Sequence, residues 1–468
     1  MAKQKIYYRC QECGHISPKW MGHCPACDSW HTFEEYVEEG SSSSQSHRLT
    51  QNKERLSKPS ETNGENQPSL IKDISIDESA RMGSGISEFD RVLGGGFMPA
   101  SLVLIGGDPG IGKSTLMLQI PYHNPDLKIL YCSGEESKGQ IKQRAERIGV
   151  PGDALYISSD TRAQAILNQA ASIQPDLLIV DSIQSVYSEE LQSMPGSQAQ
   201  VRECALLFQQ NAKQNNMTTV IIGHVTKEGD LAGPRLLEHM VDATLQFEGD
   251  HTHTYRILRG LKNRFGPTQE IGVFEMLEVG LKEVQNPSHW FIEQYDSDVS
   301  GNALVCSVEG ERPILLEVQG LVMPSSFSVP QRTATGYDHR RLALLLAVLE
   351  KRAGYQLSGQ DVYLNVAGGI RLNDTAADLA ILASLTSSLL DRPILENTVM
   401  LGEIGLGGEL RTVQKMEQRL GEIEKLGFHH VIAPYIGRRL KEKAGSQSLI
   451  VHECRHLSEA LNTALLNK

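Results

Sequence analysis

The sequence has no long apolar run: none approaches the roughly 20 residues that a membrane-spanning helix needs. It also lacks the apolar core of an export signal, because the first residues, Met1–Lys5, lead directly into polar sequence. Positive charge is in deficit, since 45 lysines and arginines oppose 57 aspartates and glutamates and give a net charge of −12. We therefore expect a cytoplasmic protein with no membrane partner, on which any contact with nucleic acid is confined to local basic sites.

Cysteine is scarce and unevenly placed, because four of the eight cysteines fall between residues 10 and 27. They form two C-x-x-C pairs separated by ten residues, a spacing that lets four thiolates surround one tetrahedral zinc ion without a large core. Disulfides are the alternative, which the missing export signal disfavours. Residues 1–37 are therefore predicted to form a four-cysteine zinc finger. The predicted zinc ligands are Cys10, Cys13, Cys24 and Cys27.

Large apolar residues are almost absent from residues 38–70, a composition typical of a flexible linker. Residues 71–285 then alternate short apolar runs with amphipathic stretches, as a parallel α/β sheet covered by helices does. Residues 286–468 contain a helical pattern at 340–349 followed by alternating strand and helix patterns. A chain of this length exceeds one core, so we expect a zinc finger, a linker and two α/β domains.

The pattern G-x-x-x-x-G-K-[ST] follows an apolar strand pattern at 101–106 and precedes a helical pattern at 115–120. In this order the glycines let successive backbone N–H groups face phosphates at the positive end of the helix. Lys113 would reach the β- and γ-phosphates of ATP, and the Ser114 hydroxyl would bind Mg²⁺. The predicted nucleotide-binding residues are Gly107, Asp108, Pro109, Gly110, Ile111, Gly112, Lys113, Ser114, Thr115 and Asp181.

Carboxylates follow two other apolar strand patterns. Asp181 ends the apolar run 177–180, the arrangement of a Walker B strand, and is predicted to hold Mg²⁺ together with Ser114. Glu135 and Glu136 follow the strand pattern 128–133, where either carboxylate could orient or deprotonate an attacking water. Their alternative role is to charge the next helix N-terminus. His224, after the run 219–223, either senses the γ-phosphate or is structural.

A pair of cations and a glycine-rich loop complete the candidate site. Lys262 and Arg264 are two apart on an extended segment and therefore project to the same side. We predict that they stabilise transition-state charge on the ATP of a neighbouring subunit. The glycine-rich loop 225–235 could hold the phosphates of a single strand, or could simply be solvated.

These motifs together resemble those of the bacterial RadA/Sms family of recombination and repair ATPases. The resemblance rests on the four-cysteine start, GDPGIGKST, SGEES, VDSIQ and, above all, KNRFG, and it covers nearly the whole chain. It implies a RecA-like P-loop ATPase core and a homohexameric ring, similar to DnaB-type helicases. It also implies movement along single-stranded and branched DNA, promotion of branch migration, and a RecA-type recombinase as partner. Lys113, Ser114 and Asp181 match the nucleotide and metal positions, and Lys262 and Arg264 lie in the signature KNRFG.

The last segment resembles the protease domain of Lon. Where Lon has its nucleophilic serine this sequence has Ala377, and Glu417 stands in the place of the partner lysine. Neither residue can perform the chemistry, so no peptide hydrolysis is expected. We expect this domain to assemble the ring, and the sequence leaves open whether it also contacts DNA. The candidate DNA contacts are Arg312, Arg332, Arg340, Arg341 and Arg371, and the alternative for each is a solvated or paired arginine.

Two rival functions are kept. An ATP-dependent protease is opposed by the missing serine and lysine. A KaiC-like signalling ATPase or scaffold is suggested by the paired Glu135 and Glu136 and opposed by the zinc finger and KNRFG. The preferred prediction is a DNA-dependent ATPase of recombination and repair, with ATP, Mg²⁺ and Zn²⁺ as its cofactors.

Overall fold

The computed structural model describes residues 6–10, 16–25, 30, 33–37, 70, 81–153, 155–224, 237–249, 255–268, 270–292, 295–326, 329–445 and 449–465. The predicted linker and the glycine-rich loop 225–235 therefore lie almost wholly outside the described residues. No helix among the described ranges is long and apolar enough to cross a membrane.

The N-terminal residues form a small antiparallel sheet in the order β2-β1-β3. Its strands are β1 (Ile6–Cys10), β2 (Ile16–Ser17) and β3 (Phe33–Val37). Cys10 pairs in register with Phe33, and these two residues and Cys24 form a small buried cluster. The first and third cysteines of the predicted finger thus share one core, while Cys13 and Cys27 lie outside the described residues.

A nine-stranded sheet follows, in the order β12-β11-β10-β9-β4-β8-β7-β5-β6. Strands β9, β4, β8, β7, β5 and β6 run parallel, and β10, β11 and β12 extend the sheet antiparallel. The mostly parallel sheet was predicted; the antiparallel extension was not. The strands are β4 (Leu102–Gly107), β5 (Ile129–Ser133), β6 (Leu155–Ser158), β7 (Leu177–Asp181), β8 (Thr218–Ile222), β9 (Ala243–Glu248), β10 (Tyr255–Asn263), β11 (Ile271–Leu277) and β12 (Gly280–Glu283).

Helices cover both faces of this sheet, which explains why its central strands are continuous apolar runs. Alternate residues of β4 enter different cores: Val103 and Ile105 pack with α2, α3 and α4, whereas Leu102 and Leu104 pack with α5 and α6. The helices are α2 (Ser87–Leu93), α3 (Lys113–His123), α4 (Lys138–Arg147), α5 (Ala163–Ile173) and α6 (Gln198–Asn215), with the short η3 (Ile183–Ser185) after β7. We call this unit the nine-stranded domain.

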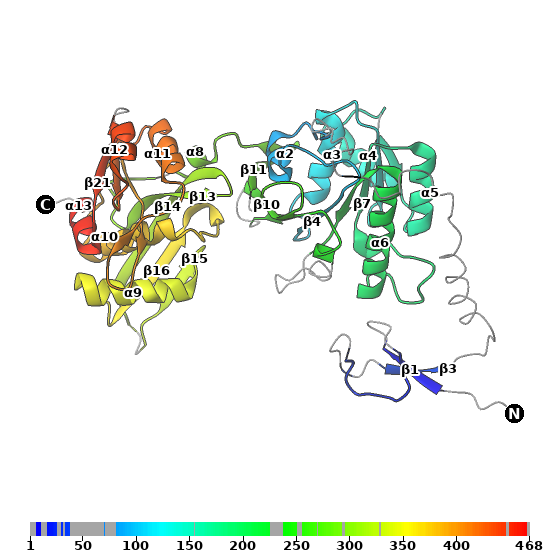
Figure 1. Ribbon diagram of the computed structural model, residues 1–468, viewed down its shortest axis with the longest axis horizontal. Helices are drawn as coiled ribbons and strands as arrows, with labels where there is room; N and C mark the ends of the chain where they lie inside the picture. Colours follow the sequence, from blue (N-terminus) through cyan, green and yellow to red (C-terminus); the bar gives the residue numbers. More distant parts are fainter. Residues whose placement is uncertain are drawn as a thin grey trace.

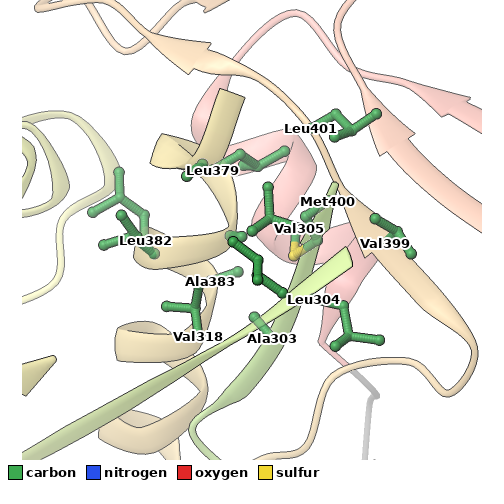
Figure 2. Close-up of a cluster of buried hydrophobic side chains, with 14 of the residues drawn as sticks. Ala303, Leu304, Val305, Val318, Leu379, Leu382, Ala383, Val399, Met400 and Leu401 are labelled. Atoms are coloured by element: carbon green, nitrogen blue, oxygen red, sulfur yellow. The ribbon is translucent and has the colours of Figure 1, made fainter. Parts of the chain in front are cut away.

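The second α/β unit, the seven-stranded domain, has a mixed sheet in the order β15-β16-β14-β13-β17-β20-β21. Its strands are β13 (Asn302–Glu309), β14 (Arg312–Pro324), β15 (Arg332–Thr335), β16 (Gln360–Val366), β17 (Thr398–Met400), β20 (His430–Ala433) and β21 (Ile450–Glu453), and β18 (Glu403–Ile404) and β19 (Leu410–Arg411) form a separate hairpin. The helices are α8 (Pro287–Phe291), α9 (His339–Ala353), η4 (Ala367–Gly369), η5 (Thr375–Ala377), α10 (Asp378–Leu390), α11 (Met416–Lys425), α12 (Arg438–Gly445) and α13 (Leu457–Ala464). Figure 2 shows the core at its centre, where side chains of β13 meet those of α10 and β17.

The two large domains meet along β10 and β11, which lie on the side of the nine-stranded domain that faces α8 and β13 (Figure 1). Ile257 of β10 belongs to the same buried apolar cluster as the core of the seven-stranded domain. Ion pairs between described residues cross the contact: Arg312 donates to Glu88 at 2.5 Å, and Arg259 donates to Glu309 at 2.6 Å. Because buried charges are costly to separate, these pairs fix how the domains dock.

Candidate functional site

The phosphate-loop residues lie between β4, which ends at Gly107, and α3, which begins at Lys113. Gly112 has φ of +118°, and a Cβ added there would lie 2.7 Å from Cε of Met276. The backbone conformation therefore favours glycine at this position, whereas the flexible end of the Met276 side chain could move away from a Cβ. The sequence motif has the strand, loop and helix order that its chemistry needs.

Lys113 is only 4% exposed, and its ammonium donates to the carbonyls of Gly107 at 2.8 Å and Asp108 at 2.9 Å. Burial lowers the pKa of Lys113, and the negative charges of Asp181, Asp108 and Glu135 partly oppose that shift. The ammonium is thus held by carbonyls of the loop, and the three carboxylates favour its charged form.

The two residues predicted to bind Mg²⁺ are joined by a tyrosine that sequence reasoning missed. Asp181 ends β7 and is 6% exposed, and the hydroxyl of Tyr131 donates to its Oδ2. Burial, followed by the charge of Asp181, raises the pKa of Tyr131 well above the usual value, and the nearby Ser114 side chain partly opposes this shift. The Ser114 hydroxyl and the Asp181 carboxylate both lie near the Tyr131 phenol. As potential metal ligands they offer only oxygen atoms, which Mg²⁺ prefers. The only sequence signal for Tyr131 was its place on a strand beside β7.

Glu135 lies where a catalytic carboxylate would be useful. Its Oε1 accepts from the Ser182 hydroxyl and lies 3.0 Å from Nε2 of His224, whose Nδ1 is 3.4 Å from Nζ of Lys113. The His224 hydrogen bond is the main cause that lowers the pKa of Glu135 to about 2, and burial opposes it. Glu135 is therefore an ionised acceptor near Lys113, and its side chain, 46% exposed, is accessible to water.

Glu136 has a different environment. Its carboxylate accepts from Arg144 of α4, and its backbone N–H donates to Oγ of Ser133 at 3.1 Å. The helix that follows is capped instead by Ser137, which forms a capping box with Gln140. Of the two adjacent glutamates, Glu135 is therefore the one that the fold brings to Lys113.

The side chains of Lys262 and Arg264 lie on the same side of their segment, because both contact the turn at residues 239–241. Lys262 donates to the carbonyl of Val241 at 3.0 Å, and Arg264 donates to that of His239 at 3.1 Å. Burial and the neighbouring Arg264 lower the pKa of Lys262.

The strand register separates this pair from the phosphate loop of the same chain. Asn263 of β10 pairs with Ala243 of β9, which in turn pairs with Val103 at the start of β4. Gly107, at the loop end of β4, is four residues away, or roughly 13 Å at the rise of a strand. The basic pair and the loop therefore lie at opposite ends of the sheet.

Ala377 and Glu417 are the residues predicted to stand where Lon has its serine and lysine. Ala376 and Ala377 are fully buried in η5, and Glu417 is exposed in the first turn of α11. Beside them Arg419, 3% exposed, pairs with Asp374 at 2.7 Å and donates to the Cys306 carbonyl. An ion pair with structural contacts occupies this region.

Of the five arginines predicted to contact DNA, one is excluded by its burial. Arg312 is 8% exposed and is bound to Glu88 and to the Gln285 carbonyl, so its guanidinium docks the two domains and the prediction for it is wrong. Arg341 is part of an ion pair with Asp378. Arg332, Arg340 and Arg371 are exposed.

Metal binding at the N-terminus is not tested by these side chains, because Cys13 and Cys27 lie outside the described residues. Cys10 and Cys24 are both buried. Among the described side chains no group of three or more histidines, cysteines or carboxylates could hold a metal ion.

Comparison with known families follows the same three parts. A rubredoxin-type metal-binding family matches residues 8–35, the KaiC ATPase family matches residues 82–160, and the family of the Mg-chelatase subunit ChlI matches residues 332–436. The KaiC match contains the phosphate loop, β5 and Glu135. The protein is thus an α/β P-loop ATPase with an N-terminal zinc ribbon and a C-terminal Lon-like domain, as the sequence predicts.

The nearly full-length relatives are more specific. A DNA repair protein RadA from Halalkalibacterium halodurans is 50% identical over 437 residues, which cover 93% of this chain and 93% of the relative. The DNA repair protein RadA from Bacillus subtilis is 46% identical over 467 residues, which cover 99% of this chain and 100% of the relative. This chain belongs to the RadA family of DNA repair proteins. The solved structure of a KaiC-like protein from Pyrococcus horikoshii OT3 is 20% identical in sequence, with a TM-score of 0.37. The match covers 44% of this chain and 98% of that protein's chain.

Proposed function

We propose that this DNA repair ATPase is a homohexameric ring that hydrolyses ATP to move along single-stranded DNA. In this proposal it promotes branch migration and processes branched intermediates of homologous recombination in the cytoplasm, with a RecA-type recombinase as partner. The domain limits 1–37, 38–70, 71–285 and 286–468 belong to the same proposal. DNA binding itself is implied by membership of a DNA repair family.

The proposed site assigns a task to each residue. The loop N–H groups and Lys113 bind the phosphates, and Ser114 and Asp181 would hold Mg²⁺, which neutralises charge on the phosphate oxygens when bound. Glu135 orients and accepts a proton from the attacking water, and His224 and Ser182 hold its carboxylate. Glu136, paired with Arg144, supports the start of α4.

One observation supports the proposal of a ring: Lys262 and Arg264 lie at the end of the sheet opposite their own phosphate loop. A cation must come within hydrogen-bond distance of the transferring phosphoryl group to stabilise it. Lys262 and Arg264 cannot do so in their own chain across roughly 13 Å of strand. Their proposed target is the ATP of an adjacent copy, so that each active site is built from two chains and repetition of that contact closes a ring.

A mixing experiment tests shared sites. Arg264→Ala keeps its own phosphate loop, and Lys113→Ala keeps its own basic pair, so rings that contain both have some interfaces with both halves intact. Two inactive proteins should therefore recover measurable ATP hydrolysis when they are assembled together. The matched control mixes Arg264→Ala with the double variant Lys113→Ala/Arg264→Ala, which offers no intact interface and should not recover. Wild-type DNA-stimulated turnover by Arg264→Ala alone would refute the role.

The protease alternative is opposed by the chemistry of the Lon-like domain. Ala377, in the predicted place of the serine, offers no nucleophile, and Glu417 cannot act as a lysine base. Casein should remain intact under conditions in which ATP is hydrolysed. A KaiC-like signalling role would instead leave ATP turnover indifferent to single-stranded DNA.

A further inference from the structure

A buried arginine on β10 contacts the phosphate loop from behind. Arg256 is 6% exposed, and its Nε donates to the carbonyl oxygen of Ile111 at 3.2 Å, while Nη1 donates to the Tyr255 carbonyl at 2.7 Å. Burying a guanidinium is costly unless it makes hydrogen bonds, so these contacts hold the side chain in one place. No motif in the sequence marks this residue.

The contact also controls a backbone donor of the loop. In a trans peptide such as Ile111–Gly112, the carbonyl and the following N–H point in opposite directions. Fixing the Ile111 carbonyl toward Arg256 therefore turns the Gly112 N–H away from β10, toward the inside of the loop. A cation on the carbonyl also polarises the peptide and makes that N–H a stronger donor.

The residues on either side of Arg256 pack against the neighbouring domain. Ile257 belongs to the core of the seven-stranded domain, and the Tyr255 ring lies 5.1 Å from Trp290 and 6.0 Å from Phe291 of α8. Phe291 in turn abuts Gly368, where an added Cβ would lie 2.5 Å from its Cδ1. The strand segment that carries Arg256 is therefore held by the docked seven-stranded domain.

We propose that Arg256 is a positioning residue for the phosphate loop, turning the Gly112 N–H toward a bound triphosphate, and that docking of the seven-stranded domain keeps it there. This inference rests on the proposed nucleotide site. It gives the Lon-like domain a second task besides ring assembly, because nucleotide affinity then depends on the contact between the two domains.

The test measures the Kd of a fluorescent ATP analogue, together with KM and kcat, for the full chain. Arg256→Met keeps the volume and the apolar stem but has no donor, and it should weaken ATP binding about tenfold, as expected for a lost charge-assisted hydrogen bond. The effect should appear in KM, with kcat nearly unchanged, because a loop N–H binds the ground state and the transition state alike. Arg256→Lys restores a cationic donor and should recover most of the affinity. Arg202→Met, at an exposed position on α6, is the matched control and should bind as wild type.

Several results would overturn the proposal: wild-type affinity in Arg256→Met, equal weakening in the Met and Lys variants, or a loss confined to kcat. If Arg256→Met does not fold, Arg256→Gln replaces it, and the Lys variant must then bind ATP more tightly than the Gln variant; equal affinities overturn the proposal. Lys113→Ala separates the two levels of inference. If that variant binds the analogue as wild type does, the nucleotide site itself is wrong; if it fails to bind while Arg256→Met binds normally, only the role of Arg256 is wrong.

Docking is tested from the other domain. Gly368→Ala pushes on Phe291 without touching the nine-stranded domain directly and should raise KM for ATP by a smaller factor, about threefold. Gly359→Ala is the matched control, because Gly359 also has a positive φ in the same domain but has open space around its Cβ position. Equal KM values for the two variants would overturn the dependence on docking.

Discussion

The phosphate-loop region and the Lon-like region both hold charged side chains beside buried strands, but they use them differently. Around the loop, Glu135 is a half-exposed carboxylate whose Oε1 contacts both Ser182 and His224. Lys113 donates to two loop carbonyls and lies near His224. In the Lon-like region Arg419 and Asp374 bind each other and the backbone around them. Charges that can exchange partners support chemistry, whereas charges that saturate one another support structure.

The largest effect on ATP turnover is expected when the lysine of the phosphate loop is replaced. Lys113→Ala should lower ATP turnover at least about 100-fold, because a charge-stabilising donor to the transferring phosphoryl group is lost. The control is Lys138→Ala, at an exposed position of α4 in the same domain. Near-normal hydrolysis by Lys113→Ala, measured as phosphate release, would mean that the charges at the loop are structural as well.

The adjacent residues Glu135 and Glu136 test the same distinction between catalytic and structural charges. Glu135→Gln should lower turnover about 100-fold, as expected when a general base is lost. Glu136→Gln should lower it by less than about fivefold, because its carboxylate pairs with Arg144 at the start of α4. Single-turnover rates with saturating ATP separate this effect from binding. The opposite order would reverse the assignment of the two residues.

In the Lon-like region the same kind of change should affect stability only. Arg419→Met leaves the partly buried Asp374 without its cationic partner and should destabilise the seven-stranded domain by about 3 kcal/mol. Faster amide hydrogen exchange in α10 and β13 would report it, with exchange in α3 unchanged. Arg340→Met, at an exposed position of α9, is the control. Unchanged exchange in α10, together with reduced ATP turnover, would contradict a structural role.

Tyr131 offers a smaller test of the proposed metal position. Tyr131→Phe removes the hydroxyl that donates to Asp181 and should raise the Mg²⁺ concentration needed for half-maximal nucleotide binding about fivefold. Tyr156→Phe, at an exposed position on β6, should leave it unchanged. Identical Mg²⁺ titrations for the two variants would show that the phenol does not organise the carboxylate.

The N-terminal finger should contribute least to hydrolysis. Cys24→Ser should release one zinc ion per chain and leave the basal ATP turnover unchanged, because the finger is expected to be joined to the ATPase by a flexible linker. Metal analysis of fresh wild-type protein should find close to one zinc per chain. Less than about half an equivalent would refute the zinc site.

The sequence predicted most of this fold because its central strands are buried on both faces. The apolar runs at 101–106 and 177–180 left little freedom in their interpretation, and the glycines and Lys113 placed the phosphate loop directly after the first run. The antiparallel strands β10, β11 and β12 were not predicted. They have fewer consecutive apolar residues than the central strands, and their pairing is set by long-range contacts.

The contacts of the candidate site were less predictable, since they join residues far apart in the chain. Tyr131 and Arg256 lie on ordinary strand patterns, and only the folded sheet brings one to Asp181 and the other to Ile111. For the same reason the burial of Arg312 against Glu88 could not be seen: an arginine in an α/β sequence is usually solvated, and its partner lies on α2.

The most direct test of the whole account is the rate of ATP hydrolysis by the wild-type chain with and without single-stranded DNA. The account predicts that single-stranded DNA stimulates hydrolysis and that both Lys113→Ala and Arg264→Ala abolish the stimulated rate. The same rate with and without DNA, in protein that binds ATP through Lys113, would contradict it.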